Sequence, residues 1–168
     1  MSATAGSGSA ASGRPVFRHS VRVPYAHTDQ MGVVYYANFF VYFEMARSAV
    51  LREAGTPYGE LERRGVLLPV VEAQCRYRRP ARFDDLLEIR LRFAAIHRVR
   101  LRFEYEIWRQ DPPDGGADGW LATGHTVHVC TTRAGKVARL PPDLLRLAGG
   151  PGTDSDGQDA TESERPAP

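Results

Sequence analysis

Lysine is nearly absent from this chain, and arginine carries almost all of its positive charge. Lys136 is the only lysine, and the formal net charge is +2. So small a net charge argues against a protein that binds nucleic acid. Coding bias alone would explain the arginine content. The other explanation is a phosphate-bearing ligand, because the planar guanidinium group binds oxyanions through two hydrogen bonds.

Cysteine is also scarce, and no metal-binding pattern is present. Cys75 and Cys130 lie far apart and form no Cys-x-x-Cys pair, so we expect two free thiols in a reducing compartment. Cys75 falls in the inward phase of a predicted strand and is expected in the core rather than as a nucleophile. His125 and His128 are three residues apart on a predicted strand and face opposite sides. We therefore expect no metal and no cofactor.

Long hydrophobic runs are missing as well. No segment approaches the roughly 20 apolar residues that a membrane helix needs, and residues 1–14 lack the apolar core of a secretory signal. These residues are rich in serine and alanine and free of acid, so a transit peptide stays open beside a flexible tail. The lack of a targeting signal leads us to expect a cytoplasmic protein.

Composition divides the chain into one domain and two tails. Residues 1–14 are small and polar, and residues 149–168 are acidic with almost no large apolar side chains. Neither segment can bury enough surface to offset its ordering entropy, so both are predicted to be disordered. The domain is predicted at residues 15–148, long enough for a real hydrophobic core.

The first half of the domain predicts one strand and a long helix. Residues 17–25 alternate between apolar and polar side chains, as a strand does. A loop follows, and a helix is predicted from Asn38, or its neighbour Ala37, to about Ala54, because asparagine is a favoured N-cap. Gly55 then ends the helix.

This long helix is apolar over most of its circumference, which is typical of a buried helix. Its predicted polar stripe is narrow and consists of Glu44, Arg47, Ser48 and Arg52. A second, short helix is predicted to open at Thr56 as N-cap, with Pro57 at its first position, and to end at Gly65.

The second half of the domain predicts four strands. Residues 71–77, 87–95 and 99–107 alternate strictly between apolar and polar, with the odd-numbered positions facing inward. A turn-forming segment, residues 111–119, precedes a last strand at residues 120–132. An antiparallel sheet with one apolar face and a long apolar helix to cover it predict an α+β protein. A five-stranded antiparallel sheet wrapped around one long buried helix is the hotdog fold.

The segment that leads into the long helix carries a motif. Residues 28–39 read T-D-Q-M-G-V-V-Y-Y-A-N-F. They resemble the T-D-x-x-G-x-V-Y-x-x-N-Y motif of the 4-hydroxybenzoyl-CoA thioesterase family of hotdog proteins, including the branch associated with the bacterial tol-pal system. Phe39 departs from the tyrosine at the last place. The resemblance continues through L-L-P-V-V-E-A-Q-C-R-Y-R-R-P-A-R-F-D-D and covers roughly residues 17–145.

The resemblance implies roles for individual residues. Asp29 matches the family's catalytic carboxylate, which acts either as a general base on water or as a nucleophile on the thioester carbonyl. Tyr36 matches the position at the helix N-terminus whose backbone N–H polarises that carbonyl, where the tol-pal branch has histidine and the hydroxybenzoyl branch has tyrosine. Tyr25 matches a tyrosine that the tol-pal branch places near the site. The substrate-binding candidates are Gly32, Val34, Tyr35, Asn38 and Phe39.

Elementary chemistry agrees with these roles. A helix N-terminus offers unpaired N–H donors and about half a positive charge, both suited to a growing oxyanion. A carboxylate in an apolar setting is poorly solvated and therefore more basic. The alternative is that Asp29 is only a turn residue, and the motif that follows it favours the catalytic interpretation. For most of the nearby aromatic side chains, a place in the core is the better interpretation.

Basic residues at two turns match regions that contact phosphate in the family. The coenzyme A-binding candidates are Arg98, Arg133, Lys136 and Arg139. The alternative is a solvated basic rim.

Together these features predict an acyl-CoA thioesterase that works without a metal. The family also implies a homo-oligomer, because hotdog sheets pair edge to edge into dimers with sites at the interface, and a tetramer is open. Outward-facing arginine and glutamate rows could serve a second interface or simply be solvated. Two other functions stay open: hydrolysis of an acyl group carried by a carrier protein, and non-catalytic binding of acyl-CoA. Asp29 and Gly32 weigh against the second of these.

Overall fold

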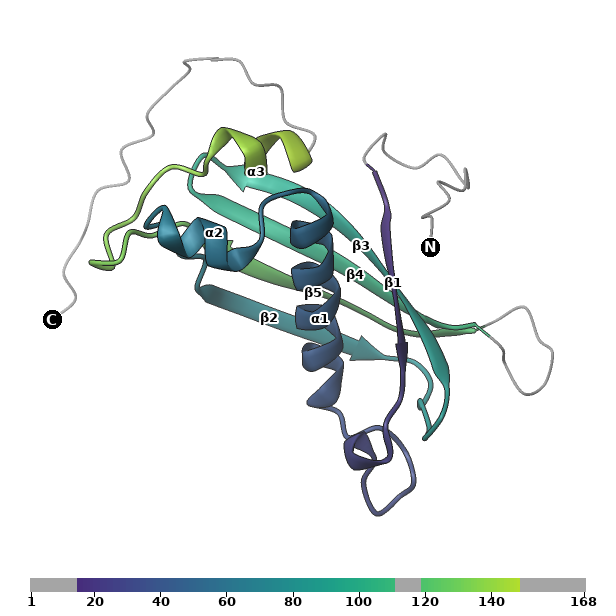
Figure 1. Ribbon diagram of the computed structural model, residues 1–168. Helices are drawn as coiled ribbons and strands as arrows, with labels where there is room; N and C mark the ends of the chain where they lie inside the picture. The colour runs from purple at the N-terminus through teal and green to yellow at the C-terminus, as the bar shows by residue number, and fades with distance from the viewer. Residues whose placement is uncertain (1–14, 111–118, 149–168) are drawn as a thin grey trace, which may run out of the picture.

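The computed structural model describes residues 15–110 and 119–148. Within them, a five-stranded antiparallel sheet curves around one long helix, α1 (Asn38–Glu53) (Figure 1). The strands are β1 (Phe17–Arg22), β2 (Val70–Tyr77), β3 (Leu86–His97), β4 (Arg100–Arg109) and β5 (Trp120–Val129), in the spatial order β1-β3-β4-β5-β2. This is the α+β hotdog arrangement predicted from the sequence. The two predicted tails and most of the predicted 111–119 turn lie outside the described residues.

The core forms where α1 packs against the concave face of the sheet. The inward residues of the central strands are almost fully buried, as their alternation predicts: Leu87, Ile89, Leu91, Phe93, Leu101, Phe103, Tyr105 and Ile107. Phe43 of α1 stacks on Tyr105 of β4 with ring centroids 4.2 Å apart. Gly124 of β5 permits this close approach, because a Cβ at that position would lie 2.6 Å from the Phe43 ring.

The predicted polar stripe of α1 is wrong at one position. Arg47 is buried and only 8% exposed, with its guanidinium group over the rings of Tyr58 and Phe103. The reason is α2 (Tyr58–Arg63), which begins with Tyr58 and covers this part of α1. A guanidinium group can be buried in this way because its flat face stacks on aromatic rings.

The predicted start of α1 at Asn38 is confirmed, but the predicted N-cap of each helix needs correction. The N-cap of α1 is Ala37, and the Asn38 side chain donates instead to the carbonyl oxygen of His27 at 2.8 Å. The N-cap of α2 is Pro57, one residue later than predicted, so Thr56 makes no capping bond. The predicted helix end is confirmed at Gly55, whose positive φ of 76° suits glycine.

The first strand is shorter than predicted. β1 ends at Arg22, and residues Tyr25–His27 form a 3₁₀ turn, η1, so Tyr25 is not a strand residue. Pro24 explains the break, because proline has no N–H to continue a strand ladder. A short helix that the sequence did not predict, α3 (Pro142–Leu147), follows β5 and is tied to α2 by an Arg64–Asp143 ion pair at 2.8 Å.

β2 does not bury the side chains predicted to face inward. Val71, Ala73 and Tyr77 are exposed, and only Cys75 is half-buried. The reason is its place at the edge of the sheet, where it pairs with β5 on one side only (Figure 1). Alternation predicted which side chains of β2 share a face, but not how much of that face other residues would cover.

No helix in the described part of the chain has both the length and the apolar character needed to span a membrane.

Candidate functional site

Asp29 lies in a tight loop between η1 and α1. The loop is closed by a bridge between Thr28 and Val34, by the Asp29 N–H donating to the Val33 carbonyl at 2.9 Å, and by the Gly32 N–H donating to the Asp29 carbonyl at 2.9 Å. Gly32 has a φ of +70°, which explains the glycine in the motif. The loop therefore holds the position of Asp29 through backbone bonds.

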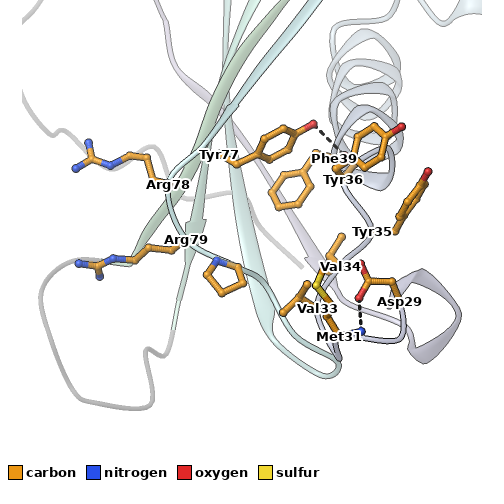
Figure 2. Close-up of a pocket in the computed structure, with 11 residues that line it drawn as sticks. Asp29, Met31, Val33, Val34, Tyr35, Tyr36, Phe39, Tyr77, Arg78 and Arg79 are labelled. Atoms are coloured by element: carbon orange, nitrogen blue, oxygen red, sulfur yellow. Dashed lines mark hydrogen bonds between the residues drawn. The ribbon is translucent and has the colours of Figure 1, made fainter.

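One oxygen of the Asp29 carboxylate is used by the loop itself. Oδ1 accepts the Met31 N–H at 2.9 Å, and among the described residues Oδ2 accepts no hydrogen bond. Figure 2 shows the carboxylate beside Tyr35, with the bond to Met31 drawn dashed. A carboxylate held at one oxygen and open at the other can accept a proton or attack a carbonyl carbon.

A pocket with a volume of about 420 Å³ lies against this carboxylate. Its walls come from the Asp29 loop, the start of α1, and the end of β2 with the residues that follow (Figure 2). The lining is mostly apolar and aromatic: Asp29, Met31, Val33, Val34, Tyr35, Tyr36, Phe39, Tyr77, Arg78, Arg79 and Pro80. A single carboxylate in such a lining matches the chemistry predicted for Asp29.

The start of α1 supplies hydrogen-bond donors beside the same pocket. The N–H groups of Asn38, Phe39 and Phe40 are satisfied by carbonyls three residues earlier. Among the described residues, the N–H groups of Tyr36 and Ala37 donate to no acceptor. Unpaired donors at the positive end of a 16-residue helix are suited to stabilise a developing oxyanion.

The structure therefore brings together five of the predicted site residues. Asp29, Val34, Tyr35, Tyr36 and Phe39 all line the pocket. Their roles remain predictions, but their common location is a finding.

Three other predicted site residues lie behind or beside the pocket. Gly32 shapes the loop, and Asn38 ties the start of α1 to His27. Tyr25 is 76% exposed and packs edge-on against Phe83, with ring centroids 5.7 Å apart. None of the three lines the pocket.

The four predicted coenzyme A-binding residues lie at the opposite end of the sheet. The Asp29 loop adjoins the segment just before β3, where Arg82 Nη1 donates to the Gly32 carbonyl at 3.4 Å. Arg98 follows the other end of β3, and its carbonyl accepts the Leu140 N–H next to Arg139. Arg133 donates to the Glu62 carbonyl at 2.7 Å, and Lys136 lies on the same turn. They do not touch this pocket within one protomer.

The pocket residues that the sequence reasoning missed come mainly from the end of β2. Tyr77, Arg78, Arg79 and Pro80 belong to the second stretch of family resemblance, but no role was assigned to them. The Val34 N–H donates to the Ala81 carbonyl at 2.8 Å, which holds this segment against the Asp29 loop. The resemblance of this segment to the thioesterase family was the one sequence signal that could have pointed to these residues.

The remaining histidines and cysteines have structural surroundings. His125 Nε2 lies 2.6 Å from Glu72, and His128 bonds to the Leu68 carbonyl. Within the described residues, no group of three or more His, Cys, Asp or Glu side chains could hold a metal ion. Cys75 and Cys130 are free thiols, as expected, and burial raises the pKa of Cys75 to about 11, which keeps it protonated.

Comparison with known proteins identifies the class. A profile of the thioesterase-like superfamily matches residues 23–147. The 1,4-dihydroxy-2-naphthoyl-CoA hydrolase of Synechococcus elongatus is 32% identical over 110 residues, 64% of this chain and 76% of the relative. The acyl-CoA thioester hydrolase YbgC of Escherichia coli is 36% identical over 92 residues, 55% of this chain and 69% of the relative. The crystal structure of a 1,4-dihydroxy-2-naphthoyl-CoA thioesterase from Synechocystis has a TM-score of 0.74 at 25% identity, covering 83% of this chain and 100% of the other.

The fold and the matched residues define a hotdog-fold thioester hydrolase. The chain belongs to the thioesterase-like superfamily. This confirms the family, the fold and the enzyme class predicted from the motif. An acyl-CoA thioesterase function is supported at the level of the family.

Proposed function

We propose that the protein hydrolyses an acyl-CoA thioester to a free acid and coenzyme A. The observation that carries this proposal is that the Asp29 carboxylate and the start of α1 line one apolar pocket of about 420 Å³. Thioester hydrolysis needs a base or nucleophile on one side of the carbonyl carbon and hydrogen-bond donors at the carbonyl oxygen. The names of the two curated relatives support a coenzyme A thioester as the substrate.

In the proposed reaction, the acyl group lies against Val34 and Phe39 and the thioester carbonyl lies at the N–H groups near Tyr36. Asp29 either takes a proton from an attacking water or attacks the carbonyl carbon itself, giving a mixed anhydride that water then hydrolyses. In both routes the C–S bond breaks, coenzyme A leaves as a thiolate that is then protonated, and the N–H groups stabilise the oxyanion. Tyr25, Gly32 and Asn38 would act on this site only through the loop that they support.

The proposed enzyme is a homo-oligomer built on the β2 edge. Val70 and Val71 on this edge are 50% and 57% exposed, and Val41 and Met45 of α1 are exposed as well. Exposed apolar side chains along an unpaired sheet edge favour pairing with a second copy. The location in the cytoplasm, expected from the sequence, stays a prediction.

Such a dimer would give the distant basic residues a role. When two β2 edges pair antiparallel about a two-fold axis, the strand direction reverses across the interface. The basic end of one protomer then lies toward the pocket end of the other. Arg98, Arg133, Lys136 and Arg139 of one subunit would thus serve the coenzyme A phosphates bound at its neighbour, where arginine pairs well with phosphate.

The test is thiol release from short, medium, long and aromatic acyl-CoA substrates, comparing wild type with Asp29→Asn. Asparagine keeps an oxygen for the Met31 N–H, so the loop should stay folded. It can neither accept a proton nor attack as a carboxylate, so we expect kcat to fall by about 10²–10⁴-fold.

Different outcomes separate the alternatives. Full activity of Asp29→Asn would remove the carboxylate from the mechanism. Absence of turnover by wild type on every acyl-CoA would reject this substrate class, and the same panel on an acyl carrier protein would then test the carrier-protein alternative. Binding of acyl-CoA with no turnover on either carrier would indicate a binding protein.

A further inference from the structure

We propose that Tyr77 is a positioning residue for the thioester carbonyl, acting through the peptide between Tyr36 and Ala37. This inference rests on the thioesterase function proposed above. Tyr77 is the last residue of β2, and its side chain reaches across to the start of α1, as Figure 2 shows. Strand alternation predicted only that its side chain faces inward, and no functional role was predicted for it.

The contact is a hydrogen bond from a side chain to the backbone at the wall of the pocket. The Tyr77 hydroxyl donates to the carbonyl oxygen of Tyr36 at 3.1 Å. That same oxygen accepts the Phe39 N–H at 3.3 Å, so the hydroxyl is its nearer partner. Both Tyr36 and Tyr77 line the pocket.

The bond acts on the donors that the proposed reaction needs. The Tyr36 carbonyl and the Ala37 N–H belong to one planar peptide group. A hydrogen bond to the carbonyl polarises that group and makes its N–H a stronger donor. The bond also fixes the plane of the peptide and therefore the direction of the Ala37 N–H. Among the described residues, neither this N–H nor that of Tyr36 has an acceptor. The carbonyl of the substrate would then meet two adjacent donors rather than one.

The surroundings of Tyr77 keep the hydroxyl in the donor role. Tyr77 is exposed in part, and partial burial of its side chain raises the pKa of Tyr77 to about 12, with neighbouring Cys75 adding to the shift, so the phenol is protonated at any working pH. The ring packs edge-on against Phe39 with centroids 5.1 Å apart, which limits where the hydroxyl can point.

The variant Tyr77→Phe tests the proposal because it keeps the ring and removes only the hydroxyl. We expect kcat on the best substrate of the acyl-CoA panel to fall about tenfold, less than the 10²–10³-fold typical for loss of a direct oxyanion donor. KM should stay within about twofold, because the pocket wall is unchanged. Tyr58→Phe is the matched control: its hydroxyl is buried beside the Arg47 guanidinium group and lies outside the pocket, so its kcat should equal that of wild type.

A spectroscopic measurement separates polarisation from a merely structural role. In the Asp29→Asn variant, the infrared stretching frequency of a ¹³C-labelled thioester carbonyl should fall when the substrate binds. Adding Tyr77→Phe should return it part of the way to its value in water. Incorporating 4-aminophenylalanine at position 77 restores a donor and should recover most of kcat. It also provides the test if the phenylalanine variant does not fold.

An unchanged kcat in Tyr77→Phe, or a rise in KM alone, would overturn the proposal while leaving the thioesterase function intact. An unchanged carbonyl frequency would overturn it as well. If wild type itself releases no thiol, the proposed function fails first and this inference fails with it.

Discussion

A histidine in the core ties this protein's stability to pH. His128 of β5 is 1% exposed, its Nδ1 donates to the Leu68 carbonyl at 2.8 Å, and its Nε2 accepts from the Thr126 hydroxyl at 3.0 Å. Burial lowers the pKa of His128 to about 4, and burial also lowers the pKa of His19. Both histidines therefore bind protons more readily in the unfolded chain than in the folded one.

Stability should fall as pH drops from about 6.5 toward 4. Because the unfolded chain takes up the proton first, the stability that neutral His128 contributes is full above its unfolded pKa and is lost toward its folded pKa of about 4. The loss across this window is at most about 3 kcal/mol from His128. Urea unfolding at a series of pH values measures it.

His128→Gln should reduce the slope of stability against pH in this window, even if it lowers stability overall. His19→Gln is the comparison, because His19 is only half-buried and should contribute less. A slope that neither variant changes would contradict the assignment to these histidines. Ion pairs lower the pKa values of carboxylates such as Glu88 and Asp143. The protonation of these groups therefore affects stability only at lower pH.

At the scale of elements, the distance between α1 and the sheet depends on one glycine. Gly124 on β5 faces Phe43 of α1, and it also adjoins the Gln74 carbonyl of β2. A Cβ at Gly124 would lie 2.5 Å from that carbonyl oxygen and 2.6 Å from the ring, so either the helix or the edge strand would have to move. The position of β2 matters to the pocket because Tyr77 ends that strand.

We expect Gly124→Ala to destabilise the fold by about 1–3 kcal/mol, the cost of overpacking a well-packed core. Thermal and urea unfolding measure the change, and thiol release should fall with it as β2 shifts. Gly59→Ala is the matched control. It lies in α2 with nothing within 4 Å of a new Cβ, so it should be neutral or stabilise by about 0.5–1 kcal/mol. Equal stability of the two variants would show that the sheet absorbs the methyl group.

At the scale of the whole molecule, the exposed β2 edge predicts self-association. Wild type should have a mass at least twice the 18.6 kDa of the chain in light scattering after size exclusion. Val71→Asp places a charge on the apolar edge and should shift the mass toward that of a monomer.

Ser20→Asp is the control for this experiment. Ser20 is exposed on β1, at the opposite edge of the sheet from β2, so its variant adds the same charge away from the proposed interface and should keep the wild-type mass. A wild-type protein that runs as a monomer would reject the homo-oligomer and, with it, the proposed role of the distant basic residues.

The sequence could predict those parts of the site that depend on residues close together in the chain. The motif from Thr28 to Phe39 predicted the Asp29 loop and the start of α1, because backbone requirements such as the left-handed Gly32 are local. Tyr77 was predicted to face inward from strand alternation, which reports the face of a residue but not what covers that face. The pairing of its hydroxyl with the Tyr36 carbonyl joins residues 41 positions apart, and no local pattern contains that information.

The sequence by itself determined the order of the five strands and of α1 and α2, and the apolar faces of β3 and β4. It also determined the buried character of α1 and the membership of a thioesterase family. These features depend on local periodicity and a contiguous motif. Only the tertiary structure decided that Arg47 is buried under Tyr58, that β2 is an exposed edge, and that the basic turns lie at the opposite end from Asp29. The physical reason is that burial and proximity depend on which elements pack together, and chain topology sets that packing.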